Sequence, residues 1–182
     1  MNGARNKLGG GASLAAAVVT TALAGCTPPA GAAAPAGDDH PLVGAPAPEF
    51  SLPRAWGNGD VSLNDAGGKV QVVDFWATWC EPCRKSFPFY EELQQRHAAE
   101  LRVVGISVDE APDPIQSFAK ETGVSFPLAW DRDQLVASQY RLPTMPTSYV
   151  IDEHRIVRFV FAGYDAGDGE RIEQSVRSLL QP

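Results

Sequence analysis

The chain has 182 residues, of which 44% are hydrophobic and 20% are charged, and its formal net charge is −7. This composition is that of a globular protein with enough apolar residues to bury one core of ordinary size. The sequence contains no cluster of lysines and arginines that could follow a phosphate backbone, so we expect no nucleic-acid partner.

The first 25 residues have the pattern of a secretory signal. A positively charged start is followed at 8–23 by a small, apolar and uncharged run, which is too short and too rich in glycine and alanine for a good membrane-spanning helix. The run ends in LAGC at 23–26, which resembles the lipobox of bacterial lipoproteins. That resemblance implies cleavage before Cys26 and a lipid anchor on this cysteine. The alternative is an ordinary signal peptide that happens to contain a cysteine.

The chain has three cysteines, an odd number that needs an explanation in a protein with an export signal. If Cys26 bears a lipid, Cys80 and Cys83 remain as one pair that is free for chemistry. Residues 26–41 are rich in proline, alanine and glycine and predict a tether, so residues 42–182 form the folded domain. Removal of the signal takes two of the 15 basic residues and none of the 22 acidic ones, which leaves a net charge of −9 on a solvated surface.

The domain opens with short extended pieces at 46–52 and 61–63, and its strongest strand signal follows at 70–76. This run is almost continuously apolar, as expected for a strand that is covered on both faces. Asp74 interrupts the run.

Behind this strand, Cys80 and Cys83 stand at the start of a helical pattern that extends to about residue 99. Two cysteines three positions apart at the start of a helix can close into a disulfide and reopen. The order strand, CxxC, helix therefore indicates a thiol–disulfide redox centre.

The rest of the chain alternates between strands and helices. We predict strands at 101–108 and, in a hairpin, at 148–152 and 156–161, with a short extended piece at 126–130. We predict three helices, each with an aspartate as its N-cap. They run from Asp113 to about 122, from Asp133 to 140 and from Asp168 to about 180. The alternation implies a parallel core, and the closing hairpin adds an antiparallel edge.

The order of elements and two motifs resemble the thioredoxin fold, and more closely the membrane-tethered TlpA/ResA branch of bacterial thiol–disulfide oxidoreductases. The motifs are VDFWATWCEPC at 73–83 and LPTMPTSYVID at 142–152, and the resemblance covers most of 45–180. It implies an α/β thioredoxin-like fold with an N-terminal extension and with a helix–strand insertion in the core at 109–142.

The resemblance implies a role for each residue of the CxxC motif. Cys80 would attack as a thiolate, because the positive end of the helix lowers the thiol pKa, and Cys83 would resolve the mixed disulfide. This redox-active disulfide would be the only redox group, so we expect no other cofactor. Pro82 fixes the first turn of the helix, whereas the charge of Glu81 opposes thiolate formation. The Glu-Pro dipeptide is similar to the subset of the family associated with cytochrome c maturation.

The second motif carries the expected substrate contacts. The resemblance implies a cis peptide bond before Pro146, which would aim the backbone of Met145 at an extended substrate chain. An ordinary trans proline that opens a strand is the alternative. Trp79 offers a flat contact surface, and we assign it to substrate binding together with Glu81, Pro82, Met145 and Thr147.

Asp74 is a carboxylate in a buried strand, six residues before Cys80. In thioredoxins an acid at this position is thought to shuttle protons to the resolving cysteine, and burial should raise its pKa. Many TlpA/ResA-like sequences carry Asn at this position. Ser86 also departs from the family pattern, because the ResA-like group usually has a Glu there. That departure weakens a narrow assignment to apocytochrome c reduction.

Our leading hypothesis is a monomeric, extracytoplasmic oxidoreductase, anchored to the bacterial membrane by a lipid on Cys26, that reduces protein disulfides with electrons from a membrane dithiol donor. An oxidant that inserts disulfides is the close alternative, since reduction potential sets the direction. A thiol peroxidase would need a Thr-Cys pattern that is missing before Cys80. A metal-binding chaperone of the same fold would need another cysteine spacing and a His before Pro146, so we expect no metal site.

Overall fold

The computed structural model describes residues 39–67 and 69–181. The predicted signal at 1–25, the lipid-anchor residue Cys26 and most of the tether at 26–41 lie outside these ranges. Within the described ranges, no helix is long and apolar enough to cross a membrane.

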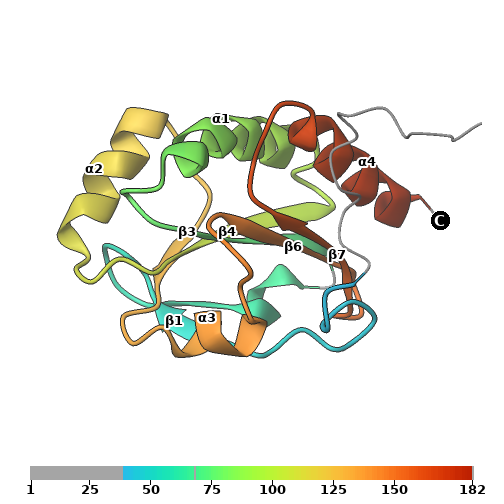
Figure 1. The fold of residues 1–182 in the computed structure, drawn as a ribbon, viewed down its shortest axis with the longest axis horizontal. Helices are drawn as coiled ribbons and strands as arrows, with labels where there is room; N and C mark the ends of the chain where they lie inside the picture. The colour runs from blue at the N-terminus through green and yellow to red at the C-terminus, as the bar shows by residue number, and fades with distance from the viewer. Residues whose placement is uncertain (1–38, 68, 182) are drawn as a thin grey trace, which may run out of the picture. The chain divides into compact units, whose positions relative to one another are not determined.

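Seven strands and five helical segments follow one another in the described part of the chain (Figure 1). The strands are β1 Ser51–Pro53, β2 Asp60–Ser62, β3 Val70–Trp76, β4 Leu101–Ser107, β5 Leu128–Trp130, β6 Thr147–Ile151 and β7 Val157–Ala162. The helices are the 3₁₀ segment η1 Leu63–Ala66 and the α-helices α1 Glu81–Arg96, α2 Asp113–Thr122, α3 Leu135–Tyr140 and α4 Asp168–Leu180.

Five of the strands form the central sheet, in the order β5-β4-β3-β6-β7. The β3/β4 and β4/β5 pairs are parallel, whereas β3/β6 and β6/β7 are antiparallel. The predicted parallel core with an antiparallel hairpin at one edge is therefore confirmed. The predicted insertion at 109–142 contains α2, β5 and α3, so it extends the sheet beyond β4.

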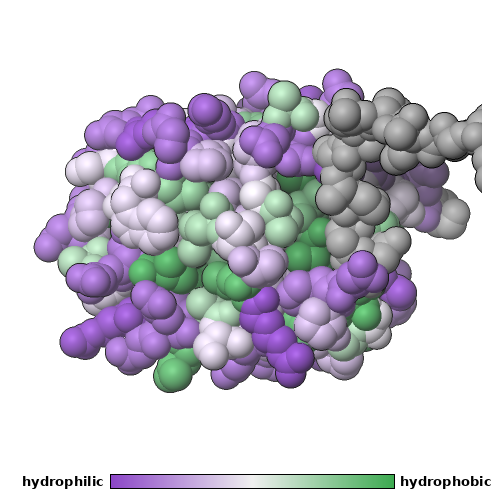
Figure 2. Space-filling model, viewed as in Figure 1, coloured by the Kyte–Doolittle hydropathy of each residue, from purple (hydrophilic) through white to green (hydrophobic). Residues whose placement is uncertain are grey.

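Helices cover both faces of the central sheet. Figure 1 shows α1, α2 and α4 on one side and α3 with the small β1/β2 hairpin on the other. All seven residues of β3 are buried, as its continuous apolar pattern predicts. Figure 2 shows apolar side chains in the middle of the viewed face, with hydrophilic residues along its upper rim and at its lower left.

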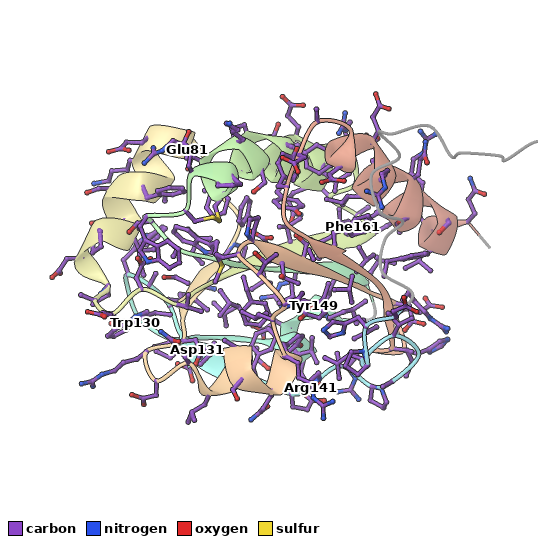
Figure 3. The ribbon with its side chains drawn as sticks, in the orientation of Figure 1. Glu81, Trp130, Asp131, Arg141, Tyr149 and Phe161 are labelled. Atoms are coloured by element: carbon purple, nitrogen blue, oxygen red, sulfur yellow. A yellow bond between two sulfur atoms is a disulfide. The ribbon has the colours of Figure 1, made fainter. Side chains whose placement is uncertain are left out.

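Alternation along β3 sends neighbouring side chains to opposite layers. The ring of Trp76 packs against Phe87 of α1 and Phe118 of α2, with centroids 4.6 and 4.7 Å away. The ring of Phe75 instead lies 4.9 Å from Tyr140 of α3. Tyr149 of β6 joins this second layer, because its hydroxyl donates to the carbonyl of Tyr140 (Figure 3). Asp74 consequently faces the layer that contains α1.

Two predicted helix caps are wrong in detail. The N-cap of α2 is Pro112, so Asp113 is already the first helical residue, and no side chain of the described chain caps this helix. At α4 the N-cap is Gly167, whose φ of 94° suits glycine. Asp168 is the first residue of α4, and its carboxylate accepts from the backbone N–H of Asp165 outside the helix. Both aspartates lie one position later than a cap requires.

The start of α3 also differs from the prediction. Asp133 lies before the helix, which begins at Leu135, and the carboxylate that meets its free N–H groups belongs to Asp131. The two oxygens of Asp131 accept from Val136 and Ala137 at 3.4 and 2.7 Å. Because Gln134 has a positive φ of 54°, the chain turns back on itself, and the earlier aspartate reaches the helix start.

Candidate active site

The cysteine pair lies at the beginning of α1. Cys80 is the N-cap residue and forms a disulfide with Cys83, with 5.3 Å between their Cα atoms. The Sγ of Cys80 accepts from the backbone N–H of Cys83 at 3.3 Å. Cys83 is fully buried and Cys80 is 4% exposed. The positive end of α1 is thus placed to stabilise a thiolate on Cys80 when the pair is reduced.

The cysteine pair has exposed residues on its outer side and a buried serine on its inner side. Trp79 is 70% exposed, and Glu81 is also exposed, so both can meet a partner chain. Figure 3 shows Glu81 at the first turn of α1. Pro82 is half-buried within the same turn. On the inner side, the buried hydroxyl of Ser86 donates to the carbonyl of Cys83 at 3.1 Å, so this serine is tied to the helix backbone.

Asp109 holds the loop that leads to Cys80, and sequence reasoning missed this residue. Its carboxylate accepts from the backbone N–H and the hydroxyl of Thr78, at 3.0 and 2.8 Å, and from the hydroxyl of Ser107 at 2.7 Å. Its backbone carbonyl accepts from the indole N–H of Trp130 at 2.7 Å. The sequence could have indicated this contact, because the carboxyl ends of parallel strands meet at one edge of a sheet. Asp109 follows β4 just as Thr78 follows β3.

The Met145–Pro146 peptide bond is cis, as predicted. Pro146 is buried, and its carbonyl accepts from the N–H of Gly163 at 2.8 Å. Thr147, the first residue of β6, is paired with Phe75 near the end of β3. This register places the Met145–Pro146 bond at the same end of the sheet as the CxxC motif.

The two residues assigned to substrate binding beside this proline differ in accessibility. Met145 is partly buried and leaves part of its surface accessible. The side chain of Thr147 is fully buried, and its hydroxyl donates to the carbonyl of Thr144 at 2.7 Å. The threonine side chain therefore holds the loop and does not face solvent.

Asp74 is fully buried in β3, at the face that α1 covers. Its Oδ1 accepts from the hydroxyl of Ser148 at 2.6 Å, and its Oδ2 has no hydrogen-bond partner among the described residues. Burial raises the pKa of Asp74 to about 7, although the hydrogen bond from Ser148 opposes this change. A carboxyl with this pKa can both accept and release a proton near neutral pH.

The described part of the chain contains no group of three or more His, Cys, Asp and Glu side chains that could hold a metal ion. Of the predicted site residues, the structure brings Cys80, Cys83, Trp79, Glu81 and Pro82 together at the start of α1. Cys26 lies outside the described residues.

Comparisons with known proteins agree with this geometry. The profile of the AhpC/TSA family matches residues 43–160. The chain is 36% identical to the thioredoxin-like protein YneN of Bacillus subtilis over 123 residues, which are 66% of this chain and 71% of that protein. It is 33% identical to the thiol-disulfide oxidoreductase ResA of the same organism over 127 residues, 69% of this chain and 70% of that protein.

A solved structure from Chlorobium tepidum, provisionally named thiol:disulfide interchange protein DsbE, superimposes with a TM-score of 0.73. It is 34% identical, and the match covers 76% of this chain and 98% of that one. A thioredoxin-like fold with a disulfide at the start of α1 defines the class of thiol–disulfide oxidoreductases. The chain belongs to the AhpC/TSA family of this fold, and it resembles the ResA-type enzymes within it.

Proposed function

We propose that the protein is an exported, lipid-anchored reductase of disulfides in extracytoplasmic proteins. The observation that carries the proposal is the Cys80–Cys83 disulfide at the N-terminus of α1, with Cys83 buried and the exposed Trp79 beside Cys80. The similarity to a protein named thiol-disulfide oxidoreductase ResA supports the same chemistry.

The reaction begins with the reduced pair. The Cys80 thiolate attacks one sulfur of a substrate disulfide, the substrate S–S bond breaks, and one substrate thiolate leaves and takes up a proton. Cys83 then gives its proton to the carboxylate of Asp74 and attacks the Cys80 sulfur. The Cys80–Cys83 disulfide forms, and the second substrate thiolate leaves. Two electrons pass from the pair to the substrate, and no bound cofactor takes part.

A dithiol donor in the membrane resets the enzyme in this proposal. Its two thiols become a disulfide as the Cys80–Cys83 bond is reduced, and Asp74 returns its proton to Cys83. A lipid on Cys26 would keep the domain at the membrane surface, close to such a donor. The Glu81-Pro82 dipeptide favours apocytochrome c as a substrate, whereas Ser86 argues against that narrow role.

The experiment that tests the direction is the equilibrium reduction potential of the Cys80–Cys83 pair, measured on the full chain against a dithiol redox buffer. A potential near or below about −250 mV supports the reductase, because such a pair gives up its electrons readily. A potential near about −120 mV favours the oxidant that inserts disulfides. A pair that stays reduced in oxidising buffer would refute both forms of the proposal.

A further inference from the structure

A buried chain of three polar side chains joins α1 to the centre of the sheet. Ser148 lies directly opposite Asp74 in the antiparallel β3/β6 pair, and its hydroxyl donates to Asp74 Oδ1. The hydroxyl of Tyr90, from α1, makes a hydrogen bond with Ser148 Oγ. None of these side chains is more than 1% exposed. A buried polar chain of this kind is stabilising only when its members satisfy one another.

The direction of the chain follows from the number of hydrogens. Ser148 has a single hydroxyl hydrogen, and it is used in the bond to Asp74. Tyr90 must therefore be the donor to Ser148, so the chain runs from Tyr90 through Ser148 to Asp74 Oδ1. The other carboxyl oxygen, Oδ2, is buried and has no partner within the described ranges.

This direction determines which oxygen binds a proton. A proton on Oδ1 would displace the Ser148 hydrogen and reverse both hydroxyls. The Tyr90 hydrogen would then lose the acceptor that it has in Ser148 Oγ. A proton on Oδ2 requires no rearrangement. Tyr90 lies seven residues after Cys83, two turns along the same buried face of α1, so the chain begins on the helix that carries the resolving cysteine.

We propose that Ser148 and Tyr90 are positioning residues that hold Asp74 by Oδ1 and thereby direct its exchangeable proton to Oδ2. The inference deepens the proposed function and rests on it, since it concerns the step in which the Sγ–H bond of Cys83 breaks and an Oδ2–H bond forms. Neither hydroxyl exchanges its own proton with the cysteine. Ser148 holds the carboxyl directly and stabilises its ionised form, and Tyr90 acts on the carboxyl through Ser148.

The ionisable groups around Asp74 come from several elements. Tyr90 belongs to α1, Tyr164 follows β7, and Asp168 of α4 acts on both tyrosines. Burial raises the pKa of each tyrosine above its ordinary value, so both stay neutral near pH 7. In the oxidised protein the cysteines form the disulfide and do not titrate. Asp74 is then the group of this cluster that titrates near neutral pH.

The first measurement is the titration of the Asp74 carboxyl carbon by NMR in the oxidised full chain. Ser148→Ala removes the hydrogen bond to the carboxylate, so we expect its pKa to rise by about one unit or more above the wild-type value. Ser148→Thr keeps the hydroxyl and should restore the wild-type titration. Tyr90→Phe should cause a smaller rise, because it only weakens the donor. Tyr164→Phe is the matched control and should cause no change.

The second measurement is the rate of disulfide reduction as a function of pH. The rise of the pH–rate profile that reports ionisation of Asp74 should move to higher pH in Ser148→Ala, so the rate at pH 7 should fall several-fold. Ser148→Thr should recover the wild-type rate. An unchanged carboxyl titration in both Ser148→Ala and Tyr90→Phe overturns the inference. A shifted titration with an unchanged rate profile in an active enzyme also overturns it. A wild-type chain that reduces no disulfides refutes the proposed function instead, whatever the carboxyl titration shows.

Discussion

At the scale of single residues, the position of Cys80 depends on the carboxylate of Asp109, which follows the neighbouring strand β4. Asp109 accepts three hydrogen bonds from Thr78 and Ser107, and its backbone accepts one from Trp130. The loop between β3 and α1 is a short turn, in which the N–H of Cys80 donates to the carbonyl of Ala77 at 3.1 Å. The buried side chain of Asp109 adds the contacts that tie this turn to the end of β4.

We expect Asp109→Ala to destabilise the protein by about 1–3 kcal/mol, because the part-buried donors of Thr78 and the buried hydroxyl of Ser107 lose their acceptor. Chemical denaturation of the oxidised chain measures this loss. Glu110→Ala is the matched control, since the neighbouring Glu110 is exposed and should change the stability by less than about 0.5 kcal/mol. Equal stabilities of the two variants would show that Asp109 does not hold the loop.

The two cysteines should respond differently to substitution. Cys83→Ser keeps the attacking thiol but removes the resolving one, so the variant should accumulate a covalent mixed disulfide with an oxidised peptide. Cys80→Ser should form little or none, because Cys83 is fully buried. Mass spectrometry under non-reducing conditions detects the adduct. An adduct of similar yield with both variants would contradict the assigned order of attack.

The raised pKa of Asp74 also makes stability depend on pH. The folded state binds a proton up to about pH 7, whereas an unfolded aspartate releases it near 3.8. The free energy of unfolding should therefore fall as pH rises from about 4 to about 7. Above pH 7 it should be lower than at pH 4 by roughly 4 kcal/mol at most.

Asp74→Asn removes this titration. The difference in unfolding free energy between the variant and the wild type should favour the variant increasingly between about pH 4 and pH 7 and then level off. Urea denaturation at several pH values measures this difference. A gap that does not change with pH would show that Asp74 titrates normally in the folded protein.

At the scale of the elements, the helix starts show what sequence patterns resolve and what they leave open. The helical periodicity and the buried strand runs place α1, β3 and β4 within a few residues of their actual bounds. The capping residues are harder to predict, because a cap depends on backbone direction as well as residue type. Asp113, Asp133 and Asp168 all have suitable side chains, but none is the N-cap residue of its helix.

The start of α3 gives a direct test. Asp131→Ala should cost about 1–3 kcal/mol of stability, because the N–H groups of Val136 and Ala137 lose their buried acceptor. Asp133→Ala should have an effect below about 0.5 kcal/mol, because this side chain is exposed and lies outside the helix. Thermal or chemical unfolding compares the two variants. A larger loss for Asp133→Ala would restore the cap that the sequence suggested.

At the scale of the whole molecule, cellular location depends on the segment before the domain. The lipobox resemblance at 23–26 predicts that Cys26 carries the membrane anchor, and this stays a prediction. Cys26→Ser should move the protein from the membrane fraction to the soluble fraction, whereas the disulfide chemistry of the domain should not change. Cell fractionation followed by a thiol–disulfide assay measures both properties. A Cys26→Ser chain that stays in the membrane fraction would exclude the lipid on this cysteine as the anchor.

The sequence by itself determined the class of fold and the redox pair. A buried strand, a CxxC motif and a helix are local features, and their order predicts the Cys80–Cys83 disulfide without knowledge of distant contacts. The cis bond before Pro146 was also predicted, through the resemblance of its local motif. These features could be predicted because each depends on residues that are close together in the chain.

Only the tertiary structure decided which polar groups meet across the sheet. Asp109 is 31 residues from Thr78, and Ser148 is 74 residues from Asp74. Those contacts depend on strand order and register, which bring β4 and β6 to the two sides of β3. Register sets which side chains face each other, and it results from the packing of the whole core rather than from any local pattern.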